Sequence, residues 1–168
     1  MIVSLTGPES SGKTYLAINI AKANKTSYLP EASRMYHLPT NYSFDDVQEL
    51  ALAQAKMIDS LRGRSELMIV DSDMIVYEIW FQERFQKLPA DWEEMKQLGR
   101  VDLHLLCKPD IPWEADPLRE NALDRDRLYA IYLKTIQNYH LPFEVIEGGK
   151  EVRLSRCLQC IDKKKAAH

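Results

Sequence analysis

One stretch, Gly7-Pro8-Glu9-Ser10-Ser11-Gly12-Lys13-Thr14, decides the fold of this chain. It fits the pattern G-x-x-x-x-G-K-[ST], and it lies in the required context, after a short apolar run and before a helical pattern. In such a loop the glycines let backbone N–H groups turn inward around a phosphate, and the next helix adds the positive end of its dipole. The alternative is a glycine-rich turn that precedes a lysine by chance, and the fixed offsets argue against it. The sequence therefore predicts a nucleoside triphosphate site.

Each residue type in this loop has an expected task. Lys13 is expected to reach the β- and γ-phosphate oxygens, and the Thr14 hydroxyl to bind Mg²⁺. The other residues expected to surround the phosphates of ATP are Gly7, Glu9, Ser10, Ser11 and Gly12. ATP and Mg²⁺ are thus the expected cofactors.

Composition limits the class of protein. The 168 residues are 45% hydrophobic and 28% charged, as in an ordinary soluble globular domain. The net charge of −3 argues against a nucleic acid or an anionic membrane as partner. No apolar run has transmembrane length, and the expected first strand leaves no room for a signal peptide, so we expect a cytoplasmic protein. One domain is expected over residues 1–162, with a flexible lysine-rich tail at 163–168.

Apolar runs and turn signals alternate in a βαβα order, which predicts a parallel sheet with helices on both faces. Strands are expected at residues 2–6, 26–29, 67–70, 102–107 and 143–146. Helices are expected at residues 13–23, 43–61, 74–85, 124–139 and 151–161. The predicted fold is α/β, a three-layer αβα sandwich with a five-stranded, mainly parallel sheet, as in P-loop nucleoside and nucleotide kinases.

The cysteines and histidines indicate neither a disulfide framework nor a metal cluster. Cys157 and Cys160 form a C-x-x-C pattern, which elsewhere is redox-active or half of a zinc site. No second pair accompanies it, and the four histidines are scattered along the chain. We interpret these cysteines as two ordinary thiols near a helix surface.

Two acids follow the apolar run at 67–70. Asp71 comes directly after this expected central strand, where a P-loop protein holds its Mg²⁺ directly or through water. Asp73 has two interpretations. It either faces the acceptor as a catalytic group, or it caps the next helix, as Asp often does.

A second acidic position follows the expected strand at 26–29. Glu31 would face the γ-phosphate there and could accept the proton from an attacking hydroxyl. Arg34 could bind an oxygen of the acceptor or of a phosphate. The alternative is a surface Glu–Arg pair on a short helical turn, and the spacing alone does not separate the two.

A shaped loop follows the expected strand at 102–107. Prolines at 109, 112 and 117 exclude a continuous helix, and an arginine-rich segment with Arg119, Arg125 and Arg127 comes next. Such a lid can exclude water and bring guanidinium groups to the migrating phosphoryl group. Trp113 either offers a flat face to a planar ring or fills the core beneath the loop.

A glycine pair follows the expected last strand. Gly149, beside Gly148, would let the backbone approach the adenine ring of ATP. An ordinary left-handed turn explains the pair equally well.

With these pieces in order, the chain resembles the nicotinamide riboside kinase domain of the bifunctional and trifunctional NAD-biosynthesis regulators and its stand-alone bacterial relatives. The resemblance spans nearly the whole chain. It rests on the loop at 7–14, Glu31-Ala32-Ser33-Arg34, Ala53-Gln54, Asp71-Ser72-Asp73, and Pro112-Trp113-Glu114-Ala115-Asp116 with Arg119.

The resemblance implies a nucleoside-kinase-like fold that transfers the ATP γ-phosphoryl group to a ribosyl 5′-hydroxyl. It implies that Trp113 and Asp116 help hold a pyridine riboside, and that the arginines after them belong to the lid. This family usually has Gly after the Asp, where this chain has Pro117, so the acceptor stays open.

We therefore expect a Mg²⁺- and ATP-dependent kinase for a nucleoside-like small molecule, with nicotinamide riboside as the first candidate. In this mechanism Asp73 or Glu31 orients the hydroxyl, and Arg119 neutralises the transition state. Two alternatives remain: a nucleotide switch or ATPase that acts through a partner, and a kinase for another nucleoside or nucleotide. The oligomeric state stays open, and a homo-oligomer is compatible with the sequence.

Overall fold

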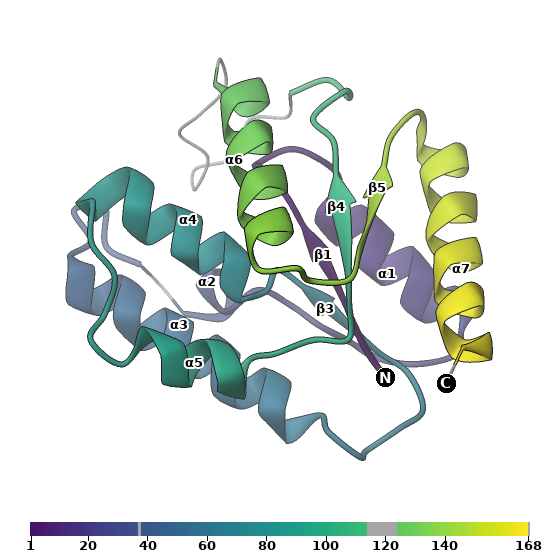
Figure 1. Cartoon of the computed structure of the whole chain (residues 1–168), viewed down its shortest axis with the longest axis horizontal. Coiled ribbons are helices and arrows are strands. Elements are labelled where there is room, and N and C mark those ends of the chain that lie inside the picture. Colours follow the sequence, from purple (N-terminus) through teal and green to yellow (C-terminus); the bar gives the residue numbers. More distant parts are fainter. Residues whose placement is uncertain (37, 114–123, 168) are drawn as a thin grey trace.

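The sheet grows outward from β1 (Ile2–Thr6), an apolar strand whose residues are all buried. The structure is a computed structural model that describes residues 1–36, 38–113 and 124–167. The other strands are β2 (Tyr28–Leu29), β3 (Met68–Asp71), β4 (Leu103–Cys107) and β5 (Phe143–Ile146). Their order across the sheet is β2-β3-β1-β4-β5, and every pairing is parallel (Figure 1).

Helices connect the strands and cover both faces of the sheet. They are α1 (Lys13–Ala23), α2 (Ala32–Met35), α3 (Phe44–Ser60), α4 (Met74–Phe85), α5 (Trp92–Leu98), α6 (Arg125–Asn138) and α7 (Lys150–Ala166). Helix α3 begins as expected at a capping box, in which Ser43 and Asp46 each satisfy a backbone N–H of the other.

The core divides into two layers because side chains alternate along each strand. Val3 and Leu5 of β1 pack with α1 and α7 on one face of the sheet. On the other face, Ile2 packs against α3, and Leu106 of β4 against α4 and α6. Figure 1 shows α7 in yellow beside α1 in purple, on the side of the sheet away from α3 and α4. The predicted three-layer αβα sandwich is confirmed.

The described elements differ from the expected ones in a few places. Strand β2 is shorter than the strand expected at 26–29. The short α2 was expected under only one alternative for Glu31 and Arg34, and α5 was not expected. Helix α5 begins after Pro89, and it forms because Trp92 and Met95 fill the core against α3 and α4. Helix α7 continues to Ala166, so residues 163–166 of the expected tail are helical.

The parallel sheet decides where the loops meet. Because all strands run in the same direction, the segments that follow β1, β2, β3, β4 and β5 leave the sheet at one edge, where open α/β folds bind ligands. In the part of the chain that the structure describes, no helix is both long enough and apolar enough to cross a lipid bilayer.

Candidate active site

The phosphate loop joins β1 to α1, and two of its positions require glycine. Gly7 has a φ of +131°, and a Cβ atom there would lie 2.6 Å from the carbonyl oxygen of Cys107 in β4. Gly12 has a φ of +84° and is the N-cap residue of α1. Residues with a Cβ atom rarely adopt such positive φ values, so glycine is needed at both positions where the chain turns into the helix.

The lysine of the motif lies within the loop itself. Its Nζ donates to the carbonyl oxygens of Gly7, at 2.8 Å, and Pro8, at 2.9 Å. The Ser11 hydroxyl also donates to Pro8, at 2.7 Å. These bonds place the ammonium group against the loop backbone, and contact between Lys13 and phosphate oxygens stays a prediction.

The next loop residue contacts the acid that follows the central strand. Thr14 Oγ1 donates to Asp71 Oδ2 at 2.6 Å, which joins α1 to the end of β3. Asp71 is 3% exposed, and its Oδ1 has no hydrogen-bond partner in the described parts of the chain. Burial raises the pKa of Asp71, while the Thr14 hydroxyl and the Lys13 charge lower it.

This pair fits Mg²⁺. A hydroxyl and a carboxylate are hard oxygen ligands, and an unpaired buried carboxylate oxygen gains a partner when a cation binds. No cluster of three or more His, Cys, Asp or Glu residues that could hold a metal occurs among the described residues. Mg²⁺ needs none, because it usually combines one or two protein ligands with water and substrate phosphates.

Glu31 lies between β2 and α2, and it is half-buried. Its Oε1 accepts from the Ser33 hydroxyl at 2.6 Å, and its Oε2 accepts from the Ser72 hydroxyl at 2.7 Å. Arg34 follows on the short α2 turn, and its charge lowers the pKa of Asp71. The turn expected under the surface-pair alternative is present, and it brings both charged residues to the end of β3.

Asp73 is buried in the interior. It is 1% exposed and caps α4 by accepting from the Ile75 N–H at 2.9 Å. Burial alone would raise its pKa, but the neighbouring His104 ring, 2.7 Å away, and the Ser4 hydroxyl together lower it. This geometry favours the capping interpretation, and a catalytic role for Asp73 remains a prediction that the geometry does not favour.

Arg125, in the described part of the segment expected to form a lid, contacts the phosphate loop. Arg125 Nη1 donates to the carbonyl oxygens of Ser10, at 3.2 Å, and Ile111, at 3.0 Å. The Arg125 guanidinium also lies over the ring of Trp113, 5.7 Å from its centroid. Arg127 instead pairs with Glu83 and Asp124 at the surface. Asp116 and Arg119, both expected in the site, lie outside the described residues.

One buried residue at the phosphate loop was not predicted from the sequence. Arg153 of α7 is 2% exposed, and its guanidinium donates to the carbonyl oxygens of Ser11, at 2.8 Å, Lys108, at 2.7 Å, and Gly148, at 2.6 Å. It also pairs with Asp110. Arg153 therefore connects the phosphate loop with the segments that follow β4 and β5. The signal was an arginine on the apolar face of an expected helix.

The glycine pair after β5 contains the expected left-handed turn. Gly148 has a φ of +91°, and its N–H donates to Asp110 Oδ2 at 2.7 Å. Gly149 has an ordinary φ of −70° and is the N-cap residue of α7. The turn interpretation thus describes Gly148, and contact between Gly149 and adenine stays a prediction.

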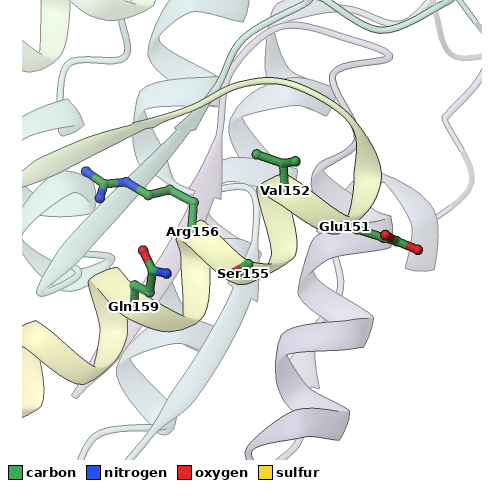
Figure 2. Close-up of a pocket in the computed structure, with 5 residues that line it drawn as sticks. All are labelled: Glu151, Val152, Ser155, Arg156 and Gln159. Atoms are coloured by element: carbon green, nitrogen blue, oxygen red, sulfur yellow. The ribbon is translucent and has the colours of Figure 1, made fainter.

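An open depression on α7 lies apart from these residues. Figure 2 shows the side chains that line it, which are Glu151, Val152, Ser155, Arg156 and Gln159. All five come from the exposed side of the helix, whereas Arg153 and the cysteines come from its buried side. The expected place of Cys157 and Cys160 near the helix surface is therefore wrong, because both thiols pack into the core against the sheet. None of the five residues that line the depression was expected in the site.

Comparison with known proteins agrees with this fold. A family model described as an AAA domain matches residues 2–153. No curated protein matches the sequence. Among solved structures, the NadR protein in complex with NR is 18% identical with a TM-score of 0.73, over 98% of this chain and 51% of that one. NadR in complex with NAD and AMP-PNP is also 18% identical, with a TM-score of 0.76, and the match covers 98% of this chain and 49% of that one.

A second kind of protein has the same fold. Deoxyadenosine kinase from M. mycoides, with dCMP and dCDP, is 12% identical with a TM-score of 0.70, over 97% of this chain and 100% of that one. By contrast, the matches to NadR cover only about half of the NadR chains, so this chain spans about half the length of NadR. At these identities the likeness concerns the fold, and the predicted NadR-like and nucleoside-kinase-like architecture is confirmed.

Proposed function

The chain belongs to the AAA domain family, and from that premise we propose that it is a Mg²⁺- and ATP-dependent kinase for a nucleoside-like acceptor. Nicotinamide riboside is the first candidate, and nicotinamide mononucleotide would be its product. The observation that carries this proposal is Glu31, a half-buried carboxylate after β2, at the edge of the sheet where Thr14 of α1 meets Asp71 of β3. A nucleotide switch has no need of a base facing an acceptor.

The proposed reaction breaks the acceptor O–H bond and forms a bond between its oxygen and the γ-phosphorus. The proton passes to Glu31, and the bond from the γ-phosphorus to the β–γ bridging oxygen breaks, which leaves ADP. Lys13, the loop amides and Arg125 bind the phosphate oxygens, and Arg119 and Gly149 keep their expected places on the nucleotide. Thr14 and Asp71 would hold Mg²⁺, which supplies positive charge at the phosphates when bound.

An aromatic side chain supports an acceptor with a planar ring. The face of Trp113 could stack on such a ring, and a cationic ring such as a pyridinium would gain a cation–π term. Arg34, Trp113 and Asp116 remain the residues proposed to contact it.

The test is an ATP-consumption assay with a panel of nucleosides and mononucleotides, nicotinamide riboside and deoxyadenosine included. We expect one nucleoside to raise turnover well above the rate in water, and Lys13→Ala to abolish the increase. Lys22→Ala, on the exposed end of the same helix, is the matched control and should behave as the wild type. If no acceptor raises turnover while ATP still binds, the proposal fails and a switch acting through a partner replaces it.

A further inference from the structure

Ser72 adopts a backbone that serine rarely adopts. It lies between Asp71 and Asp73, it is fully buried, and its φ is +76°. The left-handed region is unfavourable for a residue with a Cβ atom, and such residues persist only where the surroundings determine them.

Hydrogen bonds fix the Ser72 peptide on both sides. Its N–H donates to the carbonyl oxygen of Leu5 in β1 at 3.1 Å. Its carbonyl oxygen accepts from Gln54 Nε2 at 3.0 Å, and Gln54 Oε1 accepts from the N–H of Ala32 at 2.8 Å. Gln54 is fully buried, so it links the end of β3 to the residue next to Glu31.

This conformation places the Ser72 hydroxyl on the proposed base. Ser72 Oγ donates to Glu31 Oε2, while Ser33 Oγ donates to Oε1. A carboxylate has about four lone-pair positions, so two hydroxyl donors fix its plane and still leave positions that can accept a proton. The bonds orient Glu31 without blocking it.

We propose that Ser72 is a positioning residue for phosphoryl transfer, and that its left-handed backbone serves to aim Glu31 at the acceptor hydroxyl. This inference rests on the proposed kinase function. Ser72 does not touch the reacting atoms. It acts by holding the carboxylate that takes the proton, so its loss affects kcat more than the KM for ATP.

Two substitutions separate this role from a structural one. Ser72→Ala removes the hydroxyl but keeps a Cβ atom, so the left-handed backbone remains unfavourable. Ser72→Gly removes the hydroxyl and also the conformational penalty, because glycine adopts a positive φ readily. We expect kcat to fall about ten- to a hundredfold in both variants, because misorientation of a catalytic group has effects of that size. The KM for ATP should stay within about twofold, because the phosphate loop is intact. The unfolding midpoint should be higher for Ser72→Gly than for Ser72→Ala.

Gln86→Gly is the matched control. Gln86 also has a positive φ, +54°, but it ends α4 away from the site. This variant should raise the unfolding midpoint and leave kcat unchanged. A further control is the Ser72→Ala substitution combined with Glu31→Ala, where the loss of the serine hydroxyl should have no additional effect on kcat.

The outcomes are distinguishable. If the wild type phosphorylates no acceptor, the proposed function fails and this inference fails with it. If the wild type is active and both Ser72 variants match its kcat, the inference alone is overturned. It is also overturned if Ser72→Gly is active and only Ser72→Ala is impaired, since activity would then follow stability. Equal loss in both variants, absent in the Glu31→Ala background, supports it.

Discussion

Thr14 and Asp71 are joined by a 2.6 Å hydrogen bond that runs from the first turn of α1 to the end of β3. The bond uses only one carboxylate oxygen, and the other is buried without a partner in the described structure. The two residues come from separate motifs, yet the parallel pairing of β1 with β3 brings them together. An arrangement that leaves a charged oxygen unpaired destabilises the ligand-free protein, and a bound cation would remove that penalty.

Asp71→Asn should therefore separate stability from nucleotide binding. A raised pKa means that the folded state binds this proton more tightly than the unfolded state, so stability falls as pH rises through the folded pKa. At neutral pH the substitution removes that penalty, and the ligand-free variant should be at least as stable as the wild type. The additional stabilisation by ATP that depends on Mg²⁺ should be lost. Thermal unfolding with ATP, with and without EDTA, measures both effects.

Gly7→Ala should destabilise the protein by about 3 kcal/mol, because its Cβ meets the Cys107 carbonyl and its φ is strained. The control is Gly63→Ala. Gly63 also has a positive φ, but a Cβ atom there meets no atom within 4 Å, so the cost should be about 1 kcal/mol. Urea unfolding compares the two. Equal losses would contradict the close approach of the phosphate loop to β4.

Arg153→Met should weaken ATP binding and cost about 3 kcal/mol or more of stability, because it leaves Asp110 and buried loop carbonyls without their donor. Arg156 lies on the same helix as Arg153 and forms an exposed pair with Glu144 of β5, so Arg156→Ala should cost about 1 kcal/mol or less. Unfolding and the KM for ATP are measured for both. An unchanged KM in Arg153→Met would show that the guanidinium does not shape the nucleotide site.

The cysteines should be unreactive in the folded protein. Burial raises the pKa of Cys107 to about 12, and it raises the pKa of Cys157 and Cys160 as well. Thiolate is the reactive form, so a disulfide reagent at pH 8 should modify the thiols only after urea is added. Between about pH 9 and pH 12 the folded state also retains the Cys107 proton, whereas the unfolded state loses it. Stability should accordingly fall between about pH 9 and pH 12, and less so in Cys107→Ala.

The sequence predicted those parts of the site that depend on local pattern. Helix α1 begins at Lys13, directly after the phosphate loop, and β3 ends at Asp71, as expected. Both could be predicted because the glycine spacing and the apolar run are visible along the chain. The role of Arg153 was missed because its partners come from segments far apart in the sequence. The left-handed Ser72 was missed too, because serine has no preference for that backbone and only its tertiary contacts impose it.

Two further differences have physical reasons. Asp73 could not be assigned from the sequence, because its burial depends on His104 in β4 and Ser4 in β1. The lysines near the end of the chain read as a tail. Instead, these lysines belong to the last turn of α7, where positively charged side chains interact favourably with the helix dipole. Lys165 also donates to Asn24 Oδ1 at 3.1 Å. Whether the last residues are flexible stays a prediction.

Calorimetric titration with ATP in the presence of Mg²⁺ tests the central claim, that the backbone and ammonium of residues 7–14 bind a polyphosphate. We expect heat from binding at one site, with affinity reduced at least about tenfold in Lys13→Ala and unchanged in Lys22→Ala. If ATP, GTP and their diphosphates all gave no heat, residues 7–14 would not bind a polyphosphate, and a kinase function would be excluded whichever acceptor is tried.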